Sequence, residues 1–370
     1  MTLRFFATAA KGTEPALRDE LRELRFRRVR ADRGGVHFEG EIVDAARACL
    51  WSRVAPRILL EIGVFEAASE AALYDGARDV DWRRWMTPET SLAVRATCRS
   101  SHLTHSQFVA QKTKDAIVDA LRDKFGRRPS VDREDPDVGV AVHLLRDRAT
   151  LYLDVGGSSL HERGWRLRPG PAPLRETLAA AVLRLSGWDR TTPLLDPMCG
   201  AGTLAIEAAM WSRNRAPGLS RARFGLERWA NCDAEVRAQV DALRTQAQAA
   251  ARTGGAPIFA SDWDAQAVEW TSVNAQAARV DITVERRDVA DLQSLSPAGV
   301  VVTNPPYGER VEVDAGLYEK LARAVTRLRG HTVALLASSS AIERAMRRPP
   351  DRWWILYNGP IECRLLVYGF

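Results

Sequence analysis

The sequence lacks the residue patterns of a metalloprotein, a disulfide-rich protein or a membrane protein. Its five cysteines are scattered without a CxxC pair, and its six histidines do not have the spacing of metal ligands. We therefore expect no metal site, and reduced thiols as in a cytoplasmic protein. The opening residues MTLRFFATAAKGTEP hold only a short apolar patch, unlike a signal peptide, and no apolar run is long enough to span a membrane.

Internal repeats, low-complexity tracts and a strong excess of one charge are also missing. A chain of 370 residues with 46% hydrophobic and 27% charged residues is typical of a globular protein with two or three domains. The formal net charge of +6 is only mildly basic. Such a charge is compatible with a nucleic-acid partner but does not by itself indicate one.

The first half of the chain alternates short strand and helix patterns. A strand at 3–8, a helix from Thr13, a hairpin at 27–40 and a second helix at 41–52 predict a small α+β unit over residues 1–60. A strand at 90–98, an amphipathic helix at 104–126 and a strand pair at 138–157 predict a second unit over residues 61–165. Residues 166–173 contain three prolines and predict a stiff linker.

From Leu174 onward, short apolar runs alternate with helical patterns. The runs are PLLD, PIFASD, ITVERRD, GVVVTN, TVALLAS and CRLLVYGF. This alternation predicts a mostly parallel α/β sheet over residues 174–370. A long helix, EVRAQVDALRTQAQAAART, is predicted on an insertion after Trp229, with no chemical role.

The first run of this sheet leads into the loop DPMCGAGT. Asp196 ends the strand, Gly200 and Gly202 allow a tight turn with close approach of a ligand, and Thr203 begins a helix. The GxGxxG pattern of dinucleotide sites is missing, which disfavours a nicotinamide dehydrogenase. The acid that leads the loop would repel a pyrophosphate, whereas it suits a cationic ligand such as S-adenosylmethionine (SAM), which carries an ammonium and a sulfonium.

The next two strands also end in acids. Asp262 can accept hydrogen bonds from both hydroxyls of a ribose, and Asp288 can accept one from an adenine amino group. Acids after strands are also common helix caps, and Asp264 is explained equally well as one.

The fourth strand ends in TNPPYGER. Two consecutive prolines cannot continue a central strand, so a rigid polar turn begins at Asn304. The Asn304 side-chain oxygen and the Pro305 carbonyl can each accept one hydrogen of an exocyclic amine and aim its lone pair at a methyl donor. Pro306 stiffens the turn, and Tyr307 offers a ring on which a flipped base can stack.

The loop DPMCGAGT and the turn TNPPYGER together resemble class I (Rossmann-like) SAM-dependent methyltransferases, and among them the guanine-N2 RNA methyltransferases. RGGVHFEG, KDAIVDALR, SLHERGWR and APLRETLAAA extend the resemblance over nearly the whole chain, and make it most similar to the bacterial 23S ribosomal RNA enzymes that carry a THUMP domain after a ferredoxin-like segment. The resemblance implies SAM-binding roles for Asp196, Cys199, Gly200, Gly202, Thr203, Asp262, Asp288 and Glu176, and catalytic roles for Asn304, Pro305, Pro306 and Tyr307. Trp263 departs from the family, which usually has a smaller residue there.

The THUMP resemblance implies an RNA partner, either 23S ribosomal RNA or an assembling large ribosomal subunit. The RNA-binding candidates are Arg163, Arg166, Arg168 and Lys112. The alternatives are guanine-N2 methylation of transfer RNA, methylation of an adenine or glutamine amino group, and a non-catalytic RNA-binding assembly factor. Some relatives carry a second methyltransferase domain; the end of this sequence at Phe370 leads us to expect the guanine-N2 activity alone.

Overall fold

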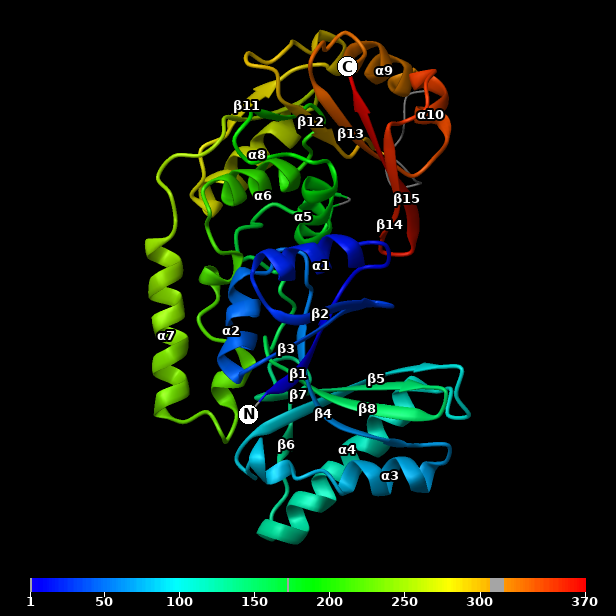
Figure 1. Ribbon diagram of the computed structural model, residues 1–370, viewed down its shortest axis with the longest axis vertical. Coiled ribbons are helices and arrows are strands. Elements are labelled where there is room, and N and C mark those ends of the chain that lie inside the picture. The colour runs from blue at the N-terminus through cyan, green and yellow to red at the C-terminus, as the bar shows by residue number, and fades with distance from the viewer. Residues whose placement is uncertain (1, 172, 307–315) are drawn as a thin grey trace.

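The computed structural model describes residues 2–171, 173–306 and 316–370, and places them around two sheets (Figure 1). An eight-stranded sheet lies in the lower half of Figure 1 and a seven-stranded sheet in the upper half. Among the described residues, no helix is both long and apolar enough to cross a membrane, and no cluster of His, Cys, Asp or Glu is suited to hold a metal ion.

The eight-stranded sheet unites the two predicted front units. Its strand order is β2-β3-β1-β4-β8-β7-β5-β6. The elements are β1 (Leu3–Thr8), α1 (Glu14–Glu23), β2 (Arg27–Asp32), β3 (Gly35–Gly40), α2 (Ile42–Trp51), β4 (Ile58–Glu66), α3 (Glu70–Arg78), β5 (Ser91–Arg99), α4 (Ser106–Phe125), β6 (Ser130–Val131), β7 (Val138–Leu145) and β8 (Arg148–Asp154). Strand β4 pairs with β1 on one side and β8 on the other, so the sheet runs without a break across the predicted boundary at residue 60.

The seven-stranded sheet has the order β11-β10-β9-β12-β13-β15-β14. Its elements are α5 (Glu176–Leu185), β9 (Leu194–Asp196), α6 (Thr203–Ser212), α7 (Ala234–Ala249), β10 (Ile258–Asp262), α8 (Ala265–Ala278), β11 (Thr283–Arg286), β12 (Val300–Thr303), α9 (Leu317–Val325), β13 (Thr332–Ala337), α10 (Ala341–Met346), β14 (Arg352–Asn358) and β15 (Ile361–Gly369). Five strands are parallel, and β15 and β14 close one side as an antiparallel pair. Helices pack on both faces, and apolar strands such as VVVT in β12 are fully buried between them.

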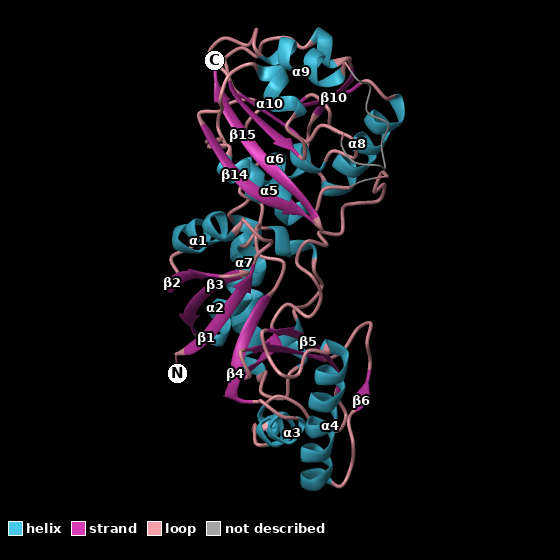
Figure 2. Cartoon of the chain, turned by 90° about the vertical axis from the view of Figure 1, so that its right-hand side faces the viewer, coloured by secondary structure: helices cyan, strands magenta, loops and turns pink. Residues whose placement is uncertain are grey.

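The sequence prediction missed the edge strand β14. Its residues RWWILYN alternate between Trp353 and Ile355, which are exposed, and Trp354 and Leu356, which face the core. This period of two, with aromatic and branched residues, is the signal of a strand covered on one face. The hairpin of β14 and β15 crosses in front of α5 and α6 in Figure 2.

The insertion between α6 and β10 ties the two sheets together. Trp229 packs edge-on against Trp85, with ring centroids 5.6 Å apart, and the N–H of Ala230 donates to the carbonyl of Trp85. Helix α7 lies along α2, at the left of Figure 1. The long helix predicted without a chemical role is therefore part of an insertion that holds the eight-stranded sheet against the seven-stranded sheet.

A buried ionic cluster lies where the two halves meet. Glu207 on α6 is fully buried and lies 3.7 Å from Arg53 and 3.3 Å from Arg163. Both arginines come from segments before the second sheet. Because an unpaired charge is costly in such a site, these contacts favour one relative placement of the two halves.

Candidate active site

Three neighbouring parallel strands bring the predicted site residues to one edge of the second sheet. Strand β9 lies between β10 and β12, and the register aligns Asp196 with Ala260 and Leu195 with Val301. Asp196, Asp262 and Asn304 therefore all follow the carboxyl ends of adjacent strands. The chain moves from β9 to β10 on one side and later to β12 on the other, which is the switch point where α/β sheets bind ligands.

The loop after β9 is held from inside the protein. The Cys199 N–H donates to the carbonyl of Ser261, and its thiol lies 3.3 Å from the hydroxyl of Thr271. Burial raises the pKa of the Cys199 thiol far above its usual range. The side chain of Cys199 therefore shapes the loop, and Thr271 also donates to the carbonyl of Gly200 at 2.9 Å.

The two glycines of the loop have different surroundings. Both have positive φ, 54° at Gly200 and 80° at Gly202. A Cβ on Gly202 would lie 2.8 Å from Cγ2 of Thr271, whereas a Cβ on Gly200 would meet no described atom within 4 Å. Gly202 is thus needed for packing at the start of α6, and Gly200 borders open space where a ligand can approach the backbone.

Asp196 is buried at the end of β9, with 2% of its surface exposed. Burial raises its pKa to about 7, although the N–H of Met198 and the hydroxyl of Thr303 favour the charged form. A carboxyl group with this pKa gains its charge readily when a cation binds beside it. The position therefore suits the charged end of a cationic ligand.

Asp262 braces the same loop. One carboxylate oxygen accepts the N–H of Gly200 at 3.0 Å, and the other accepts the N–H of Asp264 at 3.1 Å. Burial raises its pKa, and these two donors act against that effect. Each oxygen keeps a second lone pair, so hydrogen bonds to ligand hydroxyls are still available.

In the turn after β12, one side-chain hydrogen-bond acceptor has no donor among the described residues. The side-chain oxygen of Asn304 is buried and has no hydrogen-bond partner among the described residues. Buried polar atoms are nearly always paired in folded proteins, so an unpaired one at a strand end indicates a place for a ligand donor. Tyr307, the last residue of the predicted motif, lies outside the described residues.

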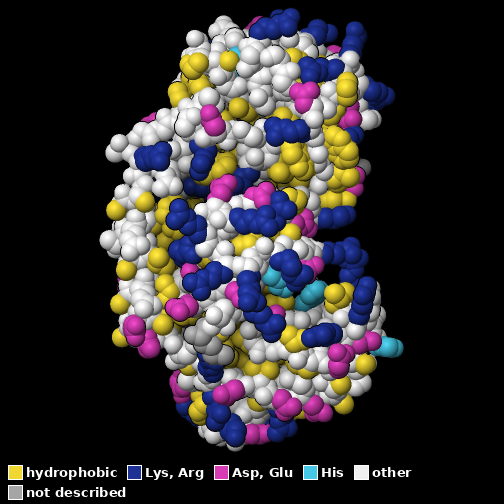
Figure 3. Space-filling view, in the orientation of Figure 1, with side chains coloured by type: hydrophobic (Ala, Val, Ile, Leu, Met, Phe, Trp, Pro, Cys, Tyr) yellow, Lys and Arg dark blue, Asp and Glu magenta, His cyan; other side chains and the backbone are white. Residues whose placement is uncertain are grey.

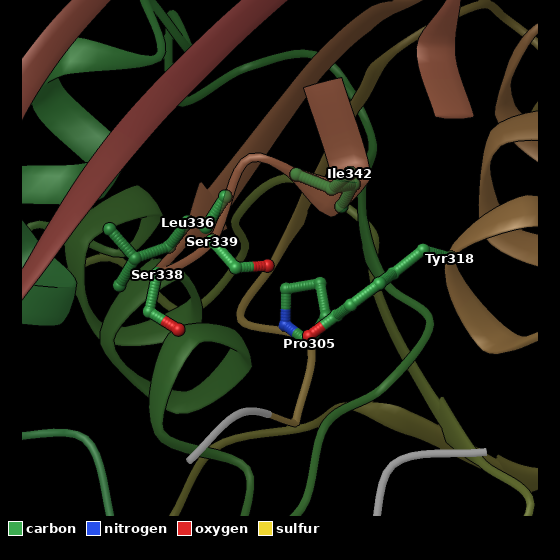
Figure 4. Close-up of a pocket in the computed structure, with 7 residues that line it drawn as sticks. Pro305, Tyr318, Leu336, Ser338, Ser339 and Ile342 are labelled. Atoms are coloured by element: carbon green, nitrogen blue, oxygen red, sulfur yellow. The ribbon is translucent and has the colours of Figure 1, made fainter. Parts of the chain in front are cut away.

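Tyr318 is a residue that the sequence analysis missed. Its hydroxyl donates to the carbonyl of Pro306 at 3.0 Å, and burial raises its pKa. Figure 4 shows Tyr318 beside Pro305, in a narrow recess that Ser338, Ser339 and Ile342 also line and that is too tight to hold a water molecule. Tyr318 therefore fixes the position of the Asn-Pro-Pro turn from α9. No local sequence pattern announces such a contact.

The remaining predicted cofactor residues have structural partners. Asp288 is exposed and caps a short 3-10 helix by accepting the N–H of Ala290, and Asp264 caps α8 through the N–H of Gln266. Glu176 begins α5, is buried and accepts from Nε of Arg166 at 2.8 Å. The indole of Trp263, next to Asp262, is 66% exposed. The cofactor contacts of Asp288 and Glu176 stay predictions.

Two of the predicted RNA-binding arginines do not face the solvent. Arg163 is 3% exposed, pairs with Glu207 and donates to the carbonyl of Arg53 at 2.6 Å. The prediction is wrong for Arg163, because a guanidinium buried in this way cannot reach a phosphate. Arg166 also turns inward, since its guanidinium binds Glu176 and the carbonyl of Leu174.

The other two candidates, Arg168 and Lys112, stay predictions. Arg168 is exposed on the linker, and the ammonium of Lys112 lies 5.5 Å from the centre of the Tyr74 ring.

Asn274 on α8, also absent from the predictions, forms hydrogen bonds with the backbone of the linker. It is fully buried; its oxygen accepts the N–H groups of Leu167 and Arg168 at 2.9 Å, and its amide donates to the carbonyls of Arg168 and Ala201. The linker is thus attached to the loop that carries Gly200 and Gly202. An asparagine at helical spacing from small apolar residues such as Ala267 and Ala278 is the sequence signal that could have indicated this.

Comparison with known families agrees with this geometry. The RMKL-like methyltransferase domain family matches residues 163–366, the THUMP domain matches 67–154, and the RlmL ferredoxin-like domain matches 4–59. The predicted boundaries at residues 60, 165 and 173 stay predictions. A parallel sheet with an acidic glycine loop after its first strand and an Asn-Pro-Pro turn after its fourth defines a class I methyltransferase domain.

The chain belongs to the RMKL-like methyltransferase family, and its methyltransferase domain follows a ferredoxin-like domain and a THUMP domain. The predicted fold class is therefore confirmed. The chain is 43% identical over 381 residues to the ribosomal RNA large subunit methyltransferase K/L of Methylococcus capsulatus, and 42% identical over 383 residues to that of Syntrophotalea carbinolica. These alignments cover 100% and 99% of the chain but only 51% and 53% of the relatives. The chain thus spans about half the length of the curated relatives it matches.

Two solved structures are similar over their full length. The SMU.472 protein, complexed with SAH, is 32% identical with a TM-score of 0.89, and the match covers 100% of this chain and 98% of that one. A protein of Listeria monocytogenes, described as a predicted N6-adenine-specific DNA methylase, is 32% identical with a TM-score of 0.88, and the match covers 100% of this chain and 97% of that one.

Proposed function

We propose that this chain is a SAM-dependent methyltransferase that modifies the exocyclic N2 amino group of a guanine in 23S ribosomal RNA. The observation that carries the proposal is the buried oxygen of Asn304, which has no hydrogen-bond partner among the described residues and lies one strand away from the acidic glycine loop. The names of the two curated relatives support large-subunit ribosomal RNA as the substrate. The cytoplasm is the corresponding place of action.

The residues around the glycine loop fit SAM. Asp196 provides a buried carboxylate for a cationic group, Asp262 keeps lone pairs for the ribose hydroxyls, and the space above Gly200 is open. The SAH found with the SMU.472 protein is the product form of the same cofactor. When bound, SAM supplies an activated methyl group on its sulfonium.

The Asn-Pro-Pro turn prepares the amine. A base amino group is a weak nucleophile because its lone pair is delocalised into the ring. Two hydrogen bonds, to the Asn304 oxygen and the Pro305 carbonyl, favour a tetrahedral nitrogen whose lone pair points away from both acceptors. Tyr318 and the prolines hold these acceptors in place before the substrate arrives, so that little reorganisation is needed. No strong base is required, because the cationic product loses its proton easily.

Substitution by alanine should have different effects at the two loop glycines. Gly202→Ala is expected to lower the free energy of unfolding by about 1–3 kcal/mol, through positive φ and the contact with Thr271. Gly200→Ala is expected to weaken SAM binding at least about tenfold with less effect on stability, because its Cβ enters the open space. Thermal denaturation and calorimetric titration with SAM measure the two effects. Unchanged SAM affinity in Gly200→Ala would contradict the proposed cofactor position.

Tyr318→Phe should slow the reaction without weakening SAM binding. The variant loses one hydrogen bond to Pro306, which corresponds to a fall in kcat of about three- to tenfold. Single-turnover methyl transfer measures this, and Tyr152→Phe in β8 of the other sheet is the matched control. A kcat equal to that of the control would show that the turn does not depend on Tyr318.

Methyl transfer from labelled SAM tests the proposed function directly. Protein-free 23S ribosomal RNA, assembling large subunits and bulk transfer RNA are compared, and the modified nucleosides are then identified. N2-methylguanosine in 23S ribosomal RNA is the expected result. N2-methylguanosine in transfer RNA would change the substrate to transfer RNA. N6-methyladenosine would mean that the enzyme methylates an adenine amino group instead, and no label in any RNA would favour an assembly factor.

A further inference from the structure

A groove opens beside the recess that holds Pro305. It lies between α10 and β14, has a volume of about 680 Å³ and is lined by Ser340, Glu343, Arg344, Arg347, Arg348, Pro349, Pro350, Trp353 and Arg364. None of these residues takes part in the cofactor site described above.

The groove continues directly from the catalytic turn. Ser339 lines the recess with Pro305, and the next residue, Ser340, lines the groove. Within α10, Ile342 faces the recess and Glu343 faces the groove. The groove therefore lies directly beside the side chains that pack around Pro305.

The charge of the groove is positive. Four arginines line it against one glutamate, and Arg364 already binds that glutamate through two contacts of 2.6 and 2.8 Å. Arg348 pairs with Asp351 at 3.0 Å. Arg344 and Arg347 are exposed and form no salt bridge to another described residue. Within the described part of the chain, these two arginines thus present charge at the rim without a carboxylate partner.

An aromatic side chain lies at the other wall. Trp353 is 51% exposed on the edge strand β14, and the guanidinium of Arg364 lies 4.5 Å above its ring. The exposed Ile355, two residues further along the same face of β14, extends the apolar surface. Figure 3 shows hydrophobic side chains along the right-hand edge of the upper half, over β14 and β15, with Lys and Arg side chains around them.

We propose that this groove binds the single-stranded RNA segment next to the target nucleotide. Arg344 and Arg347 contact its phosphates, and one base stacks on Trp353. Positive charge combined with an exposed aromatic ring matches single-stranded nucleic acid, whose backbone is anionic and whose bases present flat faces. The inference rests on the proposed function, because it assigns the groove to the substrate of that site.

Fluorescence anisotropy of the full-length chain tests the groove without methyl transfer. The probe is a fluorescein-labelled oligouridylate of about 12 nucleotides, a length that exceeds the groove and spans a typical single-strand site. Arg344→Gln/Arg347→Gln is expected to weaken binding about tenfold and to reduce the slope of log K against log salt by about 1.4, or about 0.7 for each lost phosphate contact on a single strand. Trp353→Ala is expected to weaken binding about tenfold with the slope unchanged. Arg237→Gln/Arg252→Gln, in and just after α7, is the charge-matched control and should bind as the wild type does.

A second readout separates the groove from the proposed function. With 23S ribosomal RNA as the substrate, both groove variants should raise KM and leave kcat within about twofold. If the wild type methylates RNA but the variants bind and react as it does, the groove proposal is overturned and an acidic protein surface becomes the better occupant. If the oligouridylate binds through the groove but no RNA is methylated, the groove stands and the proposed function fails. Absence of oligouridylate binding by the wild type would also overturn the proposal.

Discussion

Asn304→Ala is expected to lower kcat for methyl transfer by about 10²–10³-fold, the range seen when one preorganised hydrogen-bonding group is removed from an active site. The side-chain oxygen is buried and unpaired among the described residues, which leaves it able to accept a hydrogen from the substrate amine as proposed. Without it, the Pro305 carbonyl alone must orient the amine. Single-turnover transfer from labelled SAM to 23S ribosomal RNA measures the loss.

The SAM affinity of Asn304→Ala should stay within about twofold of the wild type, because the proposed SAM contacts lie in the loop after β9 and after β10. Asn231→Ala, at an exposed position before α7, is the control for the substitution itself. Equal losses of SAM affinity and of turnover would mean that Asn304 supports the cofactor pocket and does not act on the amine.

Asp196→Asn should bind SAM more weakly and yet fold more stably at pH 8. The pKa of Asp196 is raised to about 7 by burial, so above that pH the free protein carries a buried carboxylate at a cost. Removing the charge relieves up to about 4 kcal/mol, which is the shift of some three pKa units converted to free energy. The same change removes the proposed partner of the cationic cofactor, and we expect at least a tenfold loss of SAM affinity at pH 8.

The pH dependence of both quantities follows from the raised pKa. Because folded Asp196 holds its proton up to about pH 7 and the unfolded chain releases it near 3.8, its stabilising contribution is full at low pH and is lost as pH rises through 7. The stability advantage of Asp196→Asn should therefore grow between pH 4 and 7. Wild-type SAM affinity should fall below pH 7, by up to tenfold per pH unit, and that of the variant should be flat.

Asp189→Asn is a control for which we expect the opposite change in folding stability. The N–H groups of Thr192 and Thr191 lower the pKa of Asp189 to about 2. The charged carboxylate therefore stabilises the folded protein at pH values above the unfolded-state pKa of 3.8, and this stabilisation is lost as the pH falls towards 2. That variant should be less stable than the wild type at pH 8. Thermal denaturation and titration calorimetry at several pH values test the pair. A lower melting temperature of Asp196→Asn at pH 8 would show that the buried carboxylate of Asp196 does not destabilise the folded protein.

Sequence reasoning located the edge of the sheet where the candidate site lies, because the relevant signals are local. A strand that ends in an acid, two glycines and a helix start, or in Asn-Pro-Pro, can be read over ten residues. It failed where a side chain's role depends on distant partners. Arg163 looked like an exposed linker arginine, but its partner Glu207 lies on α6, 44 residues away. β14 was missed although its residues alternate with a period of two; only its place at the edge of the sheet had to come from the tertiary structure.

The sequence alone determined the class of fold, the order of its domains and the residues that follow the strand ends, since periodicity, glycine and proline constrain the backbone where they occur. Only the tertiary structure decided which of those groups are buried, charged or unpaired. The pKa of Asp196, the support of Pro306 by Tyr318 and the arginine groove beside α10 all arise from elements packed together across long stretches of chain. Burial and electrostatic interaction depend on spatial neighbours, and those neighbours exist only in the folded chain.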